Sequence, residues 1–314
     1  MSPPDSRTNW NPTTGLSPTD NPLPEPSAHD PRLVYETHMH TTLCRHASGS
    51  VADYAEVAIE RGLAGITVTC HCPMPDGHSA NIRMAEDEFD DYLTLVADAR
   101  AAFAGRLDIR LGLEADYFPG YESWIEALLW RADFDYVLGS VHPHLPEYRE
   151  AYWMGDTVAF QHCYFEHLAQ AAETGLFDSL AHPDLVKNLV GDEWHPGKML
   201  HHLGGYLDRI AKTGVAMELN TSGRYKTVPE MNPGPAILRA MRQRSIPVTV
   251  GADAHQPERV GEGFLEAYGL LEEAGYSDVS FFSRRSRYDE TIADCRSSML
   301  AADLELDGLQ RVTA

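Results

Sequence analysis

From residue 33 onward the sequence alternates between short apolar segments and longer amphipathic ones. Strict alternation of this kind is typical of βα units that build a mostly parallel sheet. The segments expected to be strands are Leu33–Thr37, Gly65–Thr69, Ile109–Glu114, Tyr136–Ser140, Ser179–Ala181, Val215–Asn220, Pro247–Gly251 and, more weakly, Val279–Phe282. The expected helices are Val51–Arg61, Asp87–Ala104, Tyr121–Arg131, Thr157–Thr174, Lys198–Thr213, Pro235–Arg244 and Gly261–Glu273. Seven or eight such units predict an α/β protein with a closed or nearly closed barrel. An open doubly wound sheet is disfavoured because no glycine-rich dinucleotide loop follows the first strand.

A set of histidines and acids stands where these apolar segments end. Its members are His38, His40, His46, His71, Glu114, His142, His182, Asp253 and His255. The carboxyl ends of barrel strands share one rim, so a fold of this kind gathers residues that are distant in sequence. His38 and His40 are two residues apart on an extended strand, so both imidazoles point the same way. Because imidazole nitrogens and carboxylate oxygens bind zinc and related ions, the sequence predicts a multinuclear metal site at this rim.

Composition divides the chain into one domain and two tails. Residues 1–31 are rich in Pro, Ser, Thr, Asn and Asp, and we expect them to form a disordered N-terminal tail. Residues 32–300 are expected to form a single domain, since single α/β barrels commonly run to roughly 250 residues. The stretch after about Tyr288 is expected to be a helix followed by a polar C-terminal tail over 301–314.

The excess of acidic residues limits the partners of the chain. A formal net charge of −22 repels nucleic acid and anionic lipid, and no apolar run approaches the ~20 residues that span a bilayer. We therefore expect neither a nucleic-acid nor a membrane partner. The five cysteines form no regular framework and the N-terminus has no secretory pattern, which favours the reducing cytoplasm. The oligomeric state is not indicated.

The motifs around the expected ligands are long and specific. They are ETHMH with a following RHA, the TCH strand end, GLEADYFPG, GSVH, AHPD and GADAH, the last preceded by ELNTSGR and followed by QPERVG. From about Leu33 to Phe282 the chain resembles the polymerase and histidinol phosphatase (PHP) superfamily of metal-dependent phosphoesterases, and most of all its bacterial histidinol-phosphatase branch. The resemblance implies a distorted, TIM-like (β/α)7 barrel that binds up to three divalent ions, usually zinc, manganese or iron. It also implies a small phosphorylated metabolite as substrate, with L-histidinol phosphate of histidine biosynthesis as the expected one.

By the family pattern, the resemblance implies that all nine positions are metal ligands. One ion would be held by His38, His40, Glu114 and Asp253, with Glu114 bridging to a second ion on His142 and His182. A third ion would be held by His46, His71 and His255.

Two positions depart from the family pattern, because many relatives have aspartate in place of Glu36 and of Cys70. Both positions are expected to orient a ligand imidazole through its other nitrogen, a role that Glu36 can fill and Cys70 fills poorly. Cys70 and Cys72 are interpreted as packing residues. Cys44 is interpreted as a bystander close to the metals.

Clustered divalent ions lower the pKa of a shared water from 15.7 to about 7. We therefore expect metal-bound hydroxide to attack a phosphomonoester in line, with no protein nucleophile and with Glu114, Asp253 and His255 holding the reacting centre. Because the net charge repels phosphate, cations must lie in the rim loops. Arg224 and Lys187 are the first expected phosphate clamps, with Arg149 and Arg259 behind them. His144 and Asp116 are left between proton donation and ligand orientation, and Asp184 between ligand orientation and a helix start.

Two rival functions follow from the same residues. A PHP-family phosphoesterase or another hydrolase on the same scaffold, acting on a different small substrate, stays open because fold and metals do not fix the leaving group. A non-catalytic metal-binding or polymerase-associated module is disfavoured, since the chain holds only this domain, is strongly acidic and retains all nine ligands.

Overall fold

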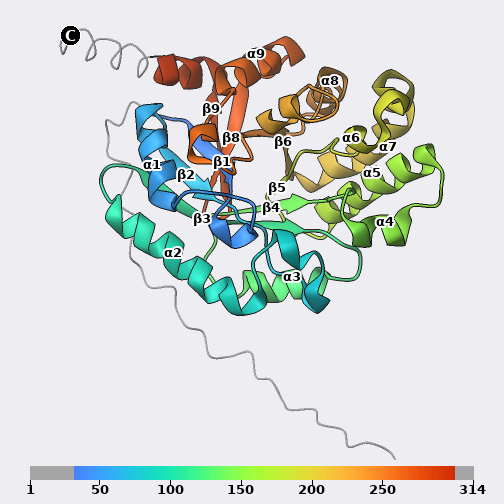
Figure 1. The fold of residues 1–314 in the computed structure, drawn as a ribbon. Helices are drawn as coiled ribbons and strands as arrows, with labels where there is room; N and C mark the ends of the chain where they lie inside the picture. Colours follow the sequence, from blue (N-terminus) through green and yellow to red (C-terminus); the bar gives the residue numbers. More distant parts are fainter. Residues whose placement is uncertain (1–31, 301–314) are drawn as a thin grey trace, which may run out of the picture. The chain divides into compact units, whose positions relative to one another are not determined.

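The computed structural model describes residues 32–300, in which helices surround a central set of strands (Figure 1). The strands are β1 Tyr35–Met39, β2 Gly65–Val68, β3 Asp108–Asp116, β4 Tyr136–Ser140, β5 Ser179–Leu180, β6 Ala216–Asn220, β7 Val248–Gly251, β8 Asp278–Ser283 and β9 Ser286–Thr291. The helices are α1 Val51–Glu60, α2 Phe89–Ala102, α3 Glu122–Leu129, α4 Pro146–Tyr152, α5 Thr157–Glu173, α6 Lys187–Val190, α7 Pro196–Thr213, α8 Pro235–Arg242 and α9 Phe264–Ala274. Residues 292–300 are also helical. The tails expected over 1–31 and 301–314 lie outside the described residues.

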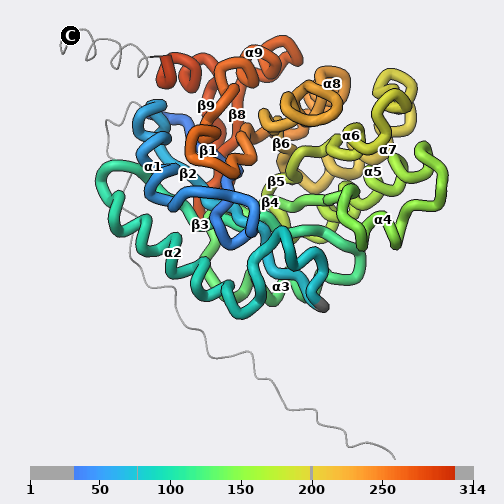
Figure 2. The backbone as a smooth tube through the Cα atoms, in the orientation of Figure 1, coloured from blue at the N-terminus to red at the C-terminus, as the bar shows by residue number. Residues whose placement is uncertain are grey.

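Strands β1 to β7 form one parallel sheet whose spatial order is the order of the sequence. The chain therefore proceeds from each strand to its neighbour by way of an outer helix, a path that Figure 2 follows by colour. The two ends of the sheet approach each other beyond β7. There the amide of His40 donates to the carbonyl oxygen of Ala254 at 2.9 Å, and the amide of Ala254 donates to His38 at 3.0 Å. The predicted nearly closed seven-stranded barrel is confirmed.

The last predicted strand does not belong to this barrel. Val279–Phe282 lies within β8, which pairs antiparallel with β9 in a separate two-stranded sheet. Residues 288–291, expected to be helical, complete β9. No parallel βα unit follows β7, so this segment turns back on itself as a hairpin instead.

The β8–β9 hairpin covers the amino-terminal end of the barrel. The Phe282 ring packs on Tyr136, the first residue of β4, with 5.2 Å between ring centroids. The amide of Arg285 donates to the carbonyl oxygen of Asp135 at 2.9 Å, and its guanidinium pairs with Asp178 just before β5. The opposite, carboxyl end of the barrel is left to the loops that carry the expected ligands.

Local sequence signals explain where the outer helices begin and end. Ser50 and Asp53 form a capping box at the start of α1. Asp156 caps α5 by accepting from the amides of Val158 and Ala159. Gly214, with φ of 77°, ends α7 in the left-handed conformation that glycine adopts without a steric penalty. Two short helices that the sequence reading missed, α4 and α6, lie in the loops after β4 and β5.

The described residues pack as one unit around an apolar core between the strands and the inner faces of the helices. Within residues 32–300, no helix combines the length and the apolar content that crossing a bilayer requires.

Candidate metal centre

The barrel brings the nine predicted ligands to one rim, with Glu114 of β3 in the middle. His71, three residues after the end of β2, forms a parallel bridge with Glu114, which places the two residues side by side. Five imidazole nitrogens surround the fully buried Glu114 carboxylate. They belong to His71 at 2.6 Å, His182 at 3.2 Å, His40 and His142 at 3.5 Å and His38 at 3.6 Å. Asp253, which follows β7, lies 3.2 Å from His40 and 3.6 Å from His38.

Within this rim the potential ligand atoms fall into overlapping groups, each lying within 4.8 Å of one another. One group is His38, His40 and Asp253, and a second is His71, Glu114 and His142. Further out lie a group of His40, His71 and His255 and a group of Cys44, His46 and His255. These groups overlap the expected partition for the inner ions. They differ from it at the outer ion, where His46 is grouped with Cys44 rather than with His71.

Four of the imidazoles are held by a contact to Nδ1 that leaves Nε2 for an ion. Nδ1 of His38 lies 2.8 Å from Oε1 of Glu218, and Nδ1 of His142 lies 2.8 Å from Asp116. His46 and His255 direct Nδ1 to backbone carbonyl oxygens, of Cys44 at 2.7 Å and of Asp253 at 3.0 Å. Such contacts fix the tautomer and the ring orientation of a metal ligand.

Glu218 and Arg83 are two supporting residues that sequence reasoning missed. Glu218 contacts His38, and it also accepts from the amide of His182 and from the side chain of Asn220, both at 2.9 Å. A signal existed for Glu218, since an acid inside an otherwise apolar strand must find a buried partner. No sequence signal marks Arg83, which comes from a loop between β2 and α2.

Asp116 connects Arg83 to the ligand His142. Its carboxylate accepts from Ser140 at 2.7 Å, contacts Nδ1 of His142 and is paired with the buried Arg83 guanidinium. Burial alone would raise the pKa of Asp116, but Arg83 and His142 hold that pKa well below its usual range. Of the two roles left open for Asp116, its contacts support the orientation of His142.

The backbone at the rim is shaped to bring ligands close. A Cβ at Gly251 would lie 2.3 Å from the Glu218 carboxylate and 2.6 Å from Cβ of His38, so only glycine lets these side chains meet. His182 and Asp253 have positive φ values of 29° and 51°. Non-glycine residues in this region cost free energy and persist where surrounding contacts impose them, which occurs most often at functional sites.

Several nitrogen and oxygen atoms of the predicted ligands are buried and lack a hydrogen-bond partner, which is what a site for divalent ions requires. These atoms include Nε2 of His38, both ring nitrogens of His40, Nδ1 of His182, Nε2 of His255 and Oε2 of Glu114. An unpartnered buried polar atom costs about 1–3 kcal/mol, a cost that bound cations would offset.

The pKa shifts favour ion binding at Glu114 and His71 and oppose it at His40, where, against the effect of burial, Asp253 and other neighbours raise the pKa to about 9. Burial would raise the pKa of Glu114, but His71 and His38 hold it well below its usual range, so the carboxylate stays ionised. Burial lowers the pKa of His71 to about 3, which keeps this imidazole neutral. Metal ligation requires these two forms, an ionised carboxylate and a neutral imidazole.

Glu36 does not have the role that the sequence predicted for it. Its carboxylate accepts backbone amides of His38 and Ala252 at 2.9 Å and of Gly261 at 2.8 Å, and no ligand imidazole. Burial raises the pKa of Glu36 to about 7 although these three amides oppose the shift. Glu36 therefore ties β1 to the chain beyond β7, while Glu218 supplies the imidazole contact.

Cys70 likewise makes no contact with a ligand imidazole through a hydrogen bond. Its sulfur accepts from the Thr41 hydroxyl at 3.2 Å, and the side chain is buried, as expected for a packing residue.

Lys187, expected as a phosphate clamp, is placed elsewhere. It is fully buried, and its ammonium donates to Asp184 at 3.1 Å, to Glu230 at 3.2 Å and to the carbonyl oxygen of Met231 at 2.8 Å. All three donors are thus used, so the clamp assignment is wrong. The apolar surroundings and the acid three residues before it convert this lysine into a structural ion pair, and Asp184 is its partner rather than a ligand-orienting residue.

The other expected cations lie at the surface of the rim loops. Arg224 pairs with the exposed Glu266 at 3.1 Å, and Arg259 pairs with Glu262. Arg149 is exposed on α4. Exposed pairs of this kind are weak, so Arg224, Arg259 and Arg149 stay predictions.

Lys226, in the loop after β6, is a cation near the centre. Its charge acts on both Asp253 and His144, which belong to loops on different sides of the rim. Among residues 32–300 the structure gives its ammonium no hydrogen bond and no salt bridge. His144 lies next to the centre, with 5.4 Å between its ring centroid and that of His142.

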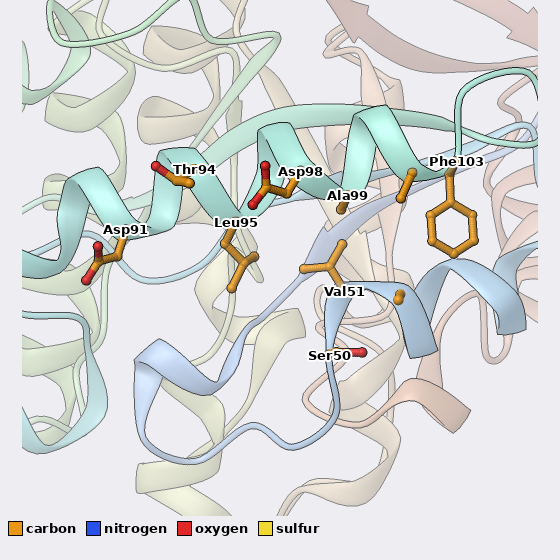
Figure 3. A pocket seen from close by; sticks show the side chains of 10 residues that line it. Ser50, Val51, Asp91, Thr94, Leu95, Asp98, Ala99 and Phe103 are labelled. Atoms are coloured by element: carbon orange, nitrogen blue, oxygen red, sulfur yellow. The ribbon is translucent and has the colours of Figure 1, made fainter.

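A separate hollow of about 510 Å³ lies between the start of α1 and the outer side of α2 (Figure 3). Val51, Leu95 and Phe103 line it together with Asp91 and Asp98, and none of the nine ligands does. This hollow is therefore separate from the nine expected ligands.

Fold and site together define the class: a seven-stranded α/β barrel with a histidine- and carboxylate-rich centre at the carboxyl ends of its strands. The chain belongs to the PHP domain family, whose model matches residues 36–222. It is 39% identical over 257 residues to a protein of Deinococcus radiodurans named "Probable histidinol-phosphatase", covering 80% of this chain and 97% of the relative. It is 28% identical to the histidinol-phosphatase of Bacillus subtilis, covering 73% and 97%.

A solved structure shares the fold. It is the histidinol phosphate phosphatase of Lactococcus lactis, complexed with zinc, L-histidinol and phosphate. The TM-score is 0.66 at 20% identity, with 81% of this chain and 98% of that chain covered.

Proposed function

We propose that this protein is a metal-dependent phosphatase that hydrolyses L-histidinol phosphate to L-histidinol and phosphate. The observation that carries the proposal is the convergence of five imidazoles on the buried Glu114 carboxylate. The substrate is supported by the histidinol-phosphatases of D. radiodurans and B. subtilis, which this chain matches over most of its length.

The nine residues at the rim would hold the ions, and Glu114 would be a ligand shared by two of the ions. Zinc is the first candidate because imidazole-rich sites suit it, with iron and manganese compatible. Divalent ions in such a site lower the pKa of water and neutralise charge on phosphoryl oxygens.

The chain's own residues provide the positioning and the remaining charge. Glu218 and Asp116 hold His38 and His142 in the orientation that directs Nε2 inward. Lys226 would meet a phosphoryl oxygen with a charge-assisted hydrogen bond, offsetting the repulsion between the acidic protein and its anionic substrate. Direct attack by water, with no protein nucleophile, is the route that we propose.

The five free thiols suit a reducing cytoplasm, where we expect the enzyme to work.

A substrate panel tests this function. Purified protein supplied with zinc or manganese is assayed for phosphate release from L-histidinol phosphate, common sugar phosphates and nucleotides. The proposal expects the highest kcat/KM for L-histidinol phosphate. A higher kcat/KM for another phosphomonoester would retain the chemistry and overturn the substrate, and no phosphate release from any of them would overturn both.

A further inference from the structure

The outer edge of the centre contains a thiol that the family-derived ligand set leaves out. Cys44 lies in the loop between His40 and His46 and is fully buried. A potential ligand atom of Cys44, of His46 and of His255 lies within 4.8 Å of the other two. Ligand bonds of about 2.0–2.3 Å to a common zinc ion can be closed from such distances by small side-chain rotations.

The two imidazoles beside Cys44 already have the required orientation. Nδ1 of each is engaged by a backbone carbonyl oxygen, so each has Nε2 left for an ion, and Nε2 of His255 is a buried atom without a partner. His40, which groups with Cys44 on its inner side, is fully buried with neither ring nitrogen hydrogen-bonded. These unpartnered imidazoles are a second indication, independent of the thiol, that a cation belongs here.

His71 is poorly placed to complete the outer set. Its Nδ1 lies 2.6 Å from Oε2 of Glu114, and it shares one ligand group with Glu114 and His142 and another with His40 and His255. Among residues 32–300, no group joins His71 to His46. Among the described residues, Cys44 is therefore the residue that shares one ligand group with both His46 and His255.

Cys70 is the alternative sulfur, but its contacts argue against it. The Thr41 hydroxyl donates to it at 3.2 Å, and although it shares a group with His40 and Cys44, it shares none with His46 or His255.

We propose that the Cys44 thiolate is a ligand of the outermost divalent ion, together with His46 and His255. The inference rests on the metal centre of the proposed function and adds a residue to it. A thiolate makes this position softer than the inner ones, which have only nitrogen and oxygen donors, so it selects zinc, cobalt or iron over manganese and magnesium.

Cobalt spectroscopy on the metal-stripped full chain tests the assignment. Co²⁺ replaces zinc and gives an intense near-ultraviolet charge-transfer band only when a thiolate is bound to it. We expect the band in the wild type and in Cys70→Ser, and its loss in Cys44→Ser. Cys163→Ser, at a partly buried thiol on α5 outside these groups, is the matched control and should keep the band. Affinity for the last ion should fall at least about tenfold in Cys44→Ser, as measured by competition with a chelator.

The wild type and Cys70→Ser suffice if Cys44→Ser does not fold, because a band retained without Cys70 assigns the sulfur to Cys44. Cobalt bound in full with no band in the wild type overturns the assignment, as does a band that Cys70→Ser abolishes. Cobalt content and hydrolysis of L-histidinol phosphate are recorded on the same samples. If cobalt binds in full and the protein turns over substrate but shows no charge-transfer band, only the Cys44 ligand is refuted. If the protein does not bind cobalt, the metal centre itself is refuted.

Discussion

Oε1 of Glu218 lies 2.8 Å from Nδ1 of His38, and both side chains are fully buried. This contact joins β6 to β1 across the barrel and orients the first imidazole of the ligand set. It is also the contact for which Gly251 leaves room.

Replacing Glu218 should weaken metal binding without removing a ligand. In Glu218→Gln the carboxylate that accepts a hydrogen bond from Nδ1 of His38 is lost. Loss of such a partner typically costs 10–100-fold in metal affinity or activity. We expect a decrease of about that size in zinc affinity, measured by chelator competition. Glu126→Gln, on the exposed side of α3, is the control. Unchanged affinity in Glu218→Gln would remove this residue from the centre.

The Arg83–Asp116 pair should be a stability determinant as well as a support for His142. Arg83→Met leaves the buried Asp116 without its charge partner, and breaking a buried pair in this way costs about 3–5 kcal/mol. The free energy of unfolding, from denaturant titration, should fall by that amount. Arg106→Met, which breaks an exposed pair with Glu56, should leave it close to the wild-type value. Equal effects of the two variants would show that Asp116 gains nothing specific from Arg83.

Lys226 should bind the phosphoryl group. Lys226→Met is expected to raise KM for L-histidinol phosphate about tenfold or more, since a charge-assisted hydrogen bond contributes ~1.5–3 kcal/mol. The inhibition constant of inorganic phosphate should rise in parallel, because product and substrate share the group. Lys212→Met, at the exposed end of α7, should change neither constant. Arg224→Ala is measured in the same way. An increase in KM and in the phosphate inhibition constant would show that Arg224 leaves Glu266 and binds the phosphoryl group.

His167 on α5 should make the fold sensitive to acid. Its Nδ1 lies 2.7 Å from the Tyr148 hydroxyl, and burial lowers the pKa of this imidazole to about 4. An unfolded histidine has a pKa near 6.5, so between about pH 6.5 and 4 the unfolded state binds more protons and stability falls as pH falls. Above about pH 6.5 the His167 imidazole is neutral in both states, so it adds no pH dependence to the free energy of unfolding.

Urea titrations of metal-free protein across this range provide the measurement. His167→Gln should lose part of the acid-induced fall in unfolding free energy, while His195→Gln, at an exposed histidine, should retain all of it. Parallel curves for wild type and His167→Gln would contradict this assignment.

Most of the fold and of the metal centre could be predicted from the residues at the strand ends. The barrel and the gathering of nine side chains followed from where polar ligands interrupt apolar segments, because parallel strands in chain order must present those ends on one rim. The supporting contacts did not follow, since they depend on which side chains meet across the barrel. Glu218 reaches His38 from β6, two strands away around the barrel, and the Lys187 ammonium binds the buried Asp184. The β8–β9 hairpin was missed for a similar reason, because a short apolar segment does not reveal whether its partner strand is parallel or antiparallel.

The most direct test of the account joins metal content to turnover in one titration. The chain is stripped with a chelator, zinc is added in steps, and bound zinc and hydrolysis of L-histidinol phosphate are measured at each step, with Glu114→Gln in parallel. The account predicts no turnover in the stripped protein, activity that rises as zinc binds up to three ions per chain, and, in Glu114→Gln, weaker zinc binding at the inner positions with loss of activity. Undiminished turnover by the metal-free protein, or wild-type zinc binding and turnover in Glu114→Gln, would contradict it.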